Sequence, residues 1–140
     1  MVQKIVIDTN VIISSLIQKI YPYTIVNELF IYDKIEMCVS EELMAEYYDV
    51  LKRAKFSRFH GFFTRAEILL VEIETKATVF KPRIKLNLIS DSDDNMILEL
   101  ADECNADFVI TGNTTDFTFP KYKETIILTP REYWENHRPN

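Results

Sequence analysis

The sequence predicts an α/β fold with a parallel central sheet. Apolar, β-branched runs at 4–7 and 108–111 are typical of strands buried on both faces, as parallel strands are. Stretches with apolar residues at helical spacing lie between such runs, which gives the expected alternation of strand and helix. The chain has 140 residues, of which 47% are hydrophobic, so we expect one domain over 1–140 with a full hydrophobic core.

The first strand ends at a carboxylate. Asp8 follows the run 4–7 directly, and a helix is expected over about 11–19 with Asn10 as its N-cap. Open α/β sheets bind ligands at the carboxyl ends of their strands. Asp8 is therefore either a metal ligand or an ordinary carboxylate that caps the helix.

A second strand is expected at 35–39, after a helical stripe at 24–32. Ser40 is a good N-cap for the helix that follows, and Glu46 lies on or near the inward face of that helix. An inward glutamate is costly unless it is paired or bound to a metal. The alternative is a surface residue that forms an ion pair with a neighbouring lysine or arginine.

Basic residues gather in two runs. The first, 52–65, interleaves cations with phenylalanines at helical core spacing, and Thr64 is expected to cap the next helix. A short strand is expected at 77–80, and the second basic run follows it in an extended loop. Cations mixed with aromatic rings suit contacts to nucleic-acid phosphates. The candidates for such contacts are Lys52, Arg53, Lys55, Arg58, Arg65, Lys81, Arg83 and Lys85.

Three aspartates crowd the start of the next helix, which is expected over 94–103. Asp91, Asp93 and Asp94 stand within four positions, although capping requires only one carboxylate. Like charges this close repel one another, and a bound cation would relieve the repulsion. The alternative is an acidic helix start that complements the helix dipole.

The strand at 108–111 again ends in small polar residues and a carboxylate. Asn113 and Asp116 follow it within a few positions. A last strand is expected at 125–128, and Thr129 then caps a short terminal helix.

Composition and charge exclude several classes of protein. With two glycines, neither a G-x-G-x-x-G loop nor a Walker A loop can be formed. A net charge of −6 argues against a protein that coats nucleic acid, but metal ions can offset clustered acids in a nuclease. The two cysteines stand among apolar residues without C-x-x-C spacing, which indicates buried thiols in a reducing compartment. We see no signal peptide and no membrane-spanning run, and therefore expect a cytoplasmic protein.

In a parallel sheet with right-handed crossovers, strand ends and helix starts gather at one edge. Asp8, Glu46, Asp94 and Asp116 can meet there. No serine–histidine or cysteine–histidine pairing accompanies them, and hard oxygen ligands suit Mg²⁺ or Mn²⁺. Phosphodiester hydrolysis is the chemistry that uses such a cluster.

Taken together and in order, four segments resemble the PIN domain family, in particular its VapC-type toxins of toxin–antitoxin systems. They are 5–11, the helix start 40–46, the acidic run 91–95 leading to Ala101, and 109–113 followed by Asp116 and Phe117. The resemblance covers essentially the whole chain. It implies a three-layer α/β/α sandwich with a central parallel sheet, and a metal-dependent ribonuclease.

The acid quartet of that family corresponds to Asp8, Glu46, Asp94 and Asp116, as catalytic residues and ligands of Mg²⁺ or Mn²⁺. Asp91 or Asp93 is the alternative to Asp94. The supporting positions are Thr9, Asn10, Asp91, Thr111 and Asn113. Asn113 stands where many relatives carry aspartate, so the resemblance leaves one or two metals open.

The resemblance further implies an RNA substrate, a cognate antitoxin and a homodimer or higher homo-oligomer, without a membrane. It does not specify the RNA. An inactive PIN-like scaffold or RNA-binding protein is the first alternative. A receiver-type phosphotransfer domain is the second, but the acidic pair after the first strand and the lysine after the last strand are missing.

Overall fold

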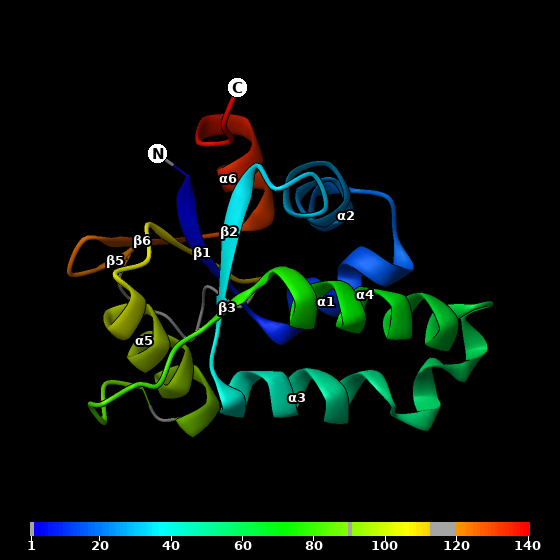
Figure 1. Ribbon diagram of the computed structural model, residues 1–140, viewed down its shortest axis with the longest axis horizontal. Helices are drawn as coiled ribbons and strands as arrows, with labels where there is room; N and C mark the ends of the chain where they lie inside the picture. The colour runs from blue at the N-terminus through cyan, green and yellow to red at the C-terminus, as the bar shows by residue number, and fades with distance from the viewer. Residues whose placement is uncertain (1, 90, 113–119) are drawn as a thin grey trace.

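The protein is described by a computed structural model covering residues 2–89, 91–112 and 120–140 (Figure 1). The strands are β1 (Gln3–Ile7), β2 (Ile35–Val39), β3 (Thr78–Val79), β4 (Phe108–Ile110), β5 (Lys121–Tyr122) and β6 (Thr125–Leu128). The helical segments are α1 (Thr9–Ile17), α2 (Tyr21–Thr24), η1 (Ile25–Phe30), α3 (Glu41–Leu51), η2 (Ala54–Arg58), α4 (Phe62–Lys76), α5 (Ser92–Cys104) and α6 (Pro130–Asn136).

The strands form one sheet in the order β3-β2-β1-β4-β6-β5. Neighbouring strands pair in parallel, with the exception of β5, which pairs antiparallel with β6. The predicted parallel sheet is confirmed. The short strand β5 at its edge was not predicted, because two residues carry too little pattern to indicate a strand.

Helices cover both faces of the sheet, as the predicted α/β/α sandwich requires. α5 packs on β1, β2 and β4, whereas η1 and α4 pack on β2. In Figure 1, α5 lies on one side of β1 and β2, and α1, α2 and α4 lie on the other. Right-handed crossovers explain this division, since the chain advances from β1 to β3 in one direction and then returns past β1 to β4.

The centre of the core is β1, which lies between β2 and β4. Ile5, Val6 and Ile7 are fully buried, because a central parallel strand is covered on both faces. Cys38 and Cys104 are buried free thiols, as predicted. Within the described residues, no helix is long and apolar enough to cross a membrane.

Two predicted helix starts are confirmed by their capping bonds. The Ser40 hydroxyl accepts a hydrogen bond of 3.1 Å from the Leu43 amide at the start of α3. At the start of α6, the Thr129 hydroxyl accepts from the Glu132 amide, and the Glu132 carboxylate accepts from the Thr129 amide. In both helices the capping side chain accepts from an amide that the helix itself leaves without a partner.

Two other predicted caps, Asn10 and Thr64, are wrong, because each helix begins earlier. α1 begins at Thr9, so Asn10 is an exposed residue of its first turn. α4 begins at Phe62, directly after Gly61, whose φ of 71° lies in the left-handed region. Glycine adopts this conformation without a Cβ clash, and it turns the chain into the helix ahead of Thr64.

Candidate active site

Asp8 lies at the carboxyl end of β1, next to the end of β4. Its amide donates to the Ile110 carbonyl at 3.0 Å, and Thr111 Oγ1 donates to Asp8 Oδ2 at 2.8 Å. The chain leaves β1 toward β2 and leaves β4 toward β6, so the two connections run in opposite directions along the sheet. Open α/β sheets bind ligands at the carboxyl ends of two such neighbouring strands. Asp8 occupies the N-cap position of α1, but its side chain makes no capping hydrogen bond. Capping therefore does not account for this buried carboxylate.

Glu46, half-buried in α3, faces the same strand end. Thr9 Oγ1 donates a hydrogen bond to Glu46 Oε2, and Thr9 directly follows Asp8. Within the described part of the chain, no lysine or arginine pairs with Glu46, and Arg53 instead pairs with Asp49 at 3.3 Å. The predicted inward position is confirmed, and the alternative of a surface ion pair is wrong.

The aspartates at the start of α5 have different structural roles. Asp91 is the N-cap, since its Oδ1 accepts from the Asp93 amide at 2.9 Å. Asp94 is buried in the first turn, because α5 begins at Ser92 instead of the predicted residue 94. One carboxylate is sufficient for capping, so capping does not account for Asp93 and Asp94.

The charge on Asp8 is disfavoured by its surroundings. Burial raises the pKa of Asp8, while the hydrogen bond from Thr111 and the backbone amide of Thr9 lower it. The negative charges of Asp91 and Asp93 raise this pKa further. The acids of β1 and α5 therefore lie within electrostatic reach of one another.

The charge on Glu46 is disfavoured in the same way. Burial raises the pKa of Glu46, the hydrogen bond from Thr9 lowers it, and the charges of Asp93 and Asp8 raise it. A hydrogen bond with the Asp93 side chain contributes in the same direction as those charges. The structure thus brings together Asp8, Glu46 and the acidic start of α5, from three elements far apart in sequence.

This donor set fits a hard divalent cation in its chemistry. Carboxylate oxygens are the ligands that Mg²⁺ prefers, and a cation offsets repulsion among acids. Across 2–89, 91–112 and 120–140, however, no three His, Cys, Asp or Glu side chains are arranged as a metal site. Two predicted positions, Asn113 and Asp116, lie outside the described residues.

Two polar residues that shape this region were not predicted as part of the site. Asn95 is buried in α5, and its Oδ1 accepts from the Leu88 and Ile89 amides at 3.1 and 3.0 Å, which holds the chain before the helix. Tyr47 is fully buried, and its hydroxyl donates to the Ile7 carbonyl. No periodicity marked Asn95, since Glu99 and Asp102 follow it at helical spacing and its face of α5 is partly polar.

The cations of the second basic run are paired with α5. Arg83 Nε lies 3.0 Å from Glu103 Oε1, and Lys85 Nζ lies 3.8 Å from Glu99 Oε1. Glu99 Oε2 also accepts from the Leu86 amide at 2.8 Å. This loop is therefore fastened along α5, although its cations stay exposed.

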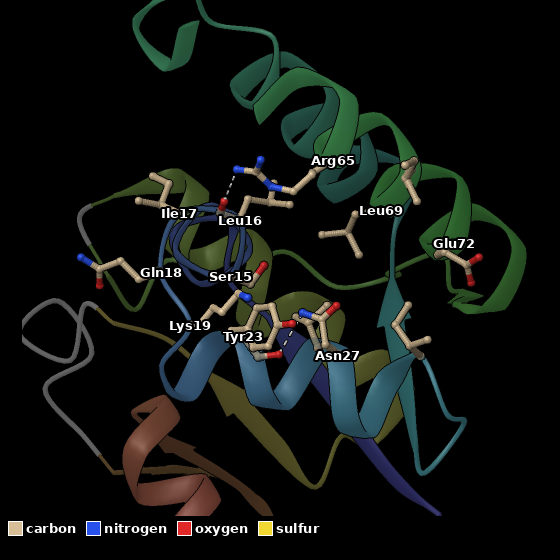
Figure 2. Close-up of a pocket in the computed structure, with 13 residues that line it drawn as sticks. Ser15, Leu16, Ile17, Gln18, Lys19, Tyr23, Asn27, Arg65, Leu69 and Glu72 are labelled. Carbon is tan, nitrogen blue, oxygen red and sulfur yellow. Dashed lines mark hydrogen bonds between the residues drawn. The ribbon is translucent and has the colours of Figure 1, made fainter. Parts of the chain in front are cut away.

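Arg65 is also engaged within the protein. Its guanidinium donates to the His60 and Leu16 carbonyls at 2.6 and 2.8 Å, which joins α4 to the end of α1 (Figure 2). It lines a cavity of about 490 Å³ between α1, η1 and α4, together with Tyr23 and Leu69. None of the candidate acids that the structure describes lines this cavity, so it is separate from Asp8, Glu46 and the start of α5.

The first basic run forms the exposed tip between α3 and α4. Lys52, Lys55 and Arg58 lie over aromatic rings, at 5.2, 5.3 and 4.9 Å from the centroids. Phe56 and Phe62 are buried below them, as their spacing predicted. The cations at this tip are accessible to a ligand from solvent.

Comparison with known proteins identifies a family and a fold. The PIN domain family matches residues 4–115. None of the curated proteins matches the chain. Among solved structures, a chain in the crystal structure of VapBC2 from Rickettsia felis bound to a DNA fragment from their promoter has a similar fold, with a TM-score of 0.59 and 17% sequence identity. The match covers 89% of this chain and 97% of that chain, and at this identity it shows the fold alone.

Proposed function

Since the chain belongs to the PIN domain family, whose members are generally nucleases, we propose that it is a metal-dependent endoribonuclease and the toxin of a toxin–antitoxin pair. The observation that carries the proposal is the convergence of Asp8, Glu46 and the start of α5 at the carboxyl end of β1. Acids held in mutual repulsion are costly to a fold, which favours a functional reason for their presence.

The residues that would hold Mg²⁺ or Mn²⁺ are Asp8, Glu46, Asp94 and Asp116, with Asp91 or Asp93 as the alternative to Asp94. Such an ion, when bound, lowers the pKa of water and offsets the charge of the phosphodiester. Thr111 and Thr9 orient the Asp8 and Glu46 carboxylates through their hydroxyls. Hydrogen bonds of this kind fix the direction in which a carboxylate presents its free oxygen.

RNA contacts are proposed for the basic runs. The exposed tip formed by Lys52, Lys55 and Arg58 is better suited than the loop at 81–85, because that loop already pairs two of its cations with α5. Phosphate contacts from such cations position a strand without reading its sequence. The RNA that is cut is therefore selected elsewhere.

An antitoxin is proposed as the partner of this protein. The family and the VapBC2 neighbour support it. We also propose that residues 1–140 form one domain, that the protein assembles as a homodimer or larger homo-oligomer, and that it acts in the cytoplasm. An inactive PIN-like scaffold is the alternative function.

The test is cleavage of labelled structured RNA with Mg²⁺ or Mn²⁺ by the wild type, Asp8→Asn and Asp94→Asn. We expect cleavage by the wild type, at least about 100-fold less by either variant, and none with EDTA. Asp49 is an exposed acid of α3 that pairs with Arg53. Asp49→Asn is therefore the matched control and should cut RNA normally. A wild type that neither cuts RNA nor gains thermal stability from Mn²⁺ would favour the inactive scaffold.

A further inference from the structure

Tyr47 joins α3 to the end of β1 at the point where two proposed ligands meet. Its side chain is fully buried, and its hydroxyl donates to the Ile7 carbonyl. Ile7 directly precedes Asp8, and Tyr47 directly follows Glu46. This hydrogen bond therefore links the backbone beside one carboxylate to the helix that carries the other.

The ladder between β1 and β2 does not reach the residues next to the two proposed ligands. Pairing between β1 and β2 ends at Ile5 and Met37, after which Cys38 and Val39 of β2 pair with β3. The ladder between β1 and β2 thus stops two residues before Ile7. A buried carbonyl requires a partner, and the Tyr47 hydroxyl supplies one to Ile7.

We propose that Tyr47 is a positioning residue that sets the separation of the Asp8 and Glu46 carboxylates, and thereby the metal affinity of the site. The inference rests on the proposed function, because it assumes that these acids hold a divalent cation. The hydrogen bond from Thr9 to Glu46 also links the two ligands, but it joins two side chains that can rotate. Metal sites require their ligands to be held within a few tenths of an ångström, and a rigid helix-to-strand contact meets that requirement.

The chain offers a matched control at the opposite end of the same strand. Tyr133 is also fully buried, and its hydroxyl donates to Gln3 Oε1 at 2.5 Å. Gln3 is the first residue of β1, whereas Ile7 is the last. Tyr47→Phe and Tyr133→Phe each remove one buried hydroxyl that binds β1 and keep the ring that fills the core, so both are expected to fold with a lower unfolding temperature.

The experiment is calorimetric titration of the full chain with Mn²⁺ for the wild type and both variants. We expect about tenfold weaker Mn²⁺ binding in Tyr47→Phe and wild-type binding in Tyr133→Phe, since the loss of a supporting hydrogen bond typically costs 10–100-fold in metal affinity. As a second measurement, saturating Mn²⁺ should restore most of the RNA cleavage by Tyr47→Phe, which a purely structural defect would not allow.

Three outcomes would overturn the inference. Wild-type Mn²⁺ affinity in Tyr47→Phe, or an equal loss in Tyr133→Phe, would make the tyrosine a structural residue only and leave the proposed nuclease intact. A wild type that binds no Mn²⁺ would remove the metal site, and with it both this inference and the proposed function.

Discussion

At the residue scale, Asp8 occupies a position that is unfavourable for stability. It is buried, other acids surround it, and its side chain does not cap α1. An asparagine in place of Asp8 would still accept the hydrogen bond from Thr111 but would carry no charge. This cost to folding supports the proposal that the Asp8 carboxylate binds a metal ion.

Asp8→Asn is expected to raise the stability of the metal-free protein while it abolishes cleavage. Removing one charge from a buried acidic cluster should contribute about 1 kcal/mol, which corresponds to roughly 3 °C in Tm for a domain of this size. Thermal unfolding in EDTA, followed by circular dichroism, measures this. A lower Tm in EDTA would show that the carboxylate stabilises the fold without metal.

The sequence around Asp8 and Glu46 indicates both as candidate site residues, because each departs from what its own strand end or helix face requires. Asp8 follows a buried strand without a cationic neighbour, and Glu46 interrupts an apolar helix face. Tyr47 departs from nothing, since a tyrosine on a buried face is ordinary packing. Its partner, the Ile7 carbonyl, lies 40 positions away in sequence, and only the fold brings the two together.

At the element scale, the start of α4 depends on the backbone of one residue. Gly61 has a φ of 71°, and a Cβ there would lie 2.9 Å from Arg65 Nη1. We expect Gly61→Ala to destabilise the fold by about 1–2 kcal/mol, through backbone strain and displacement of Arg65 from its two carbonyl partners. Gly112→Ala is the control, because a Cβ at Gly112 meets none of the described residues within 4 Å. Urea unfolding compares the two, and equal losses would contradict the account.

The two basic runs should contribute unequally to RNA binding. Lys55→Ala with Arg58→Ala removes two cations from the exposed tip, and should reduce the slope of log affinity against log salt by about 1.4 for single-stranded RNA. Arg83→Ala with Lys85→Ala removes cations that already pair with Glu103 and Glu99, and should change that slope less. Filter binding of a 2′-O-methyl RNA across a salt series measures both. Equal slope changes would mean that the loop at 81–85 also reaches the phosphates.

Helix boundaries show why patterns alone misplace an element by a few residues. Ser40 was placed correctly, since it stands between a clear strand and a clear helix. Asn10 and Thr64 have the right chemistry for a cap, but the chain turns earlier, at Asp8 and Gly61. Apolar periodicity does not distinguish these starts, because the first helical turn can carry either polar or apolar residues.

At the scale of the whole molecule, strand order decides which residues become neighbours. The sequence indicates the strands and their burial, but not that β1 lies between β2 and β4. That arrangement places Asp8 beside Thr111, and it brings the Tyr47 hydroxyl of α3 to the Ile7 carbonyl at the end of β1. The position of the acidic site could be predicted from the rule that ligands bind at strand ends. The contacts that orient its residues could not, since they depend on the packing of distant segments.

Net charge adds a further constraint on the proposed binding of RNA. The chain carries −6, and several of its acids converge at the proposed site. RNA should therefore bind weakly in EDTA and more tightly with Mn²⁺, because the ion offsets the acids that face the phosphates.

Asp8→Asn with Asp94→Asn should bind RNA several-fold more tightly than the wild type in EDTA and gain little from Mn²⁺. Asp49→Asn with Glu67→Gln removes the same charge from exposed positions of α3 and α4, so it is the control. Fluorescence anisotropy with a labelled 2′-O-methyl RNA at constant ionic strength separates the two. Equal gains in both double variants would mean that total charge, and not the acidic site, limits RNA binding.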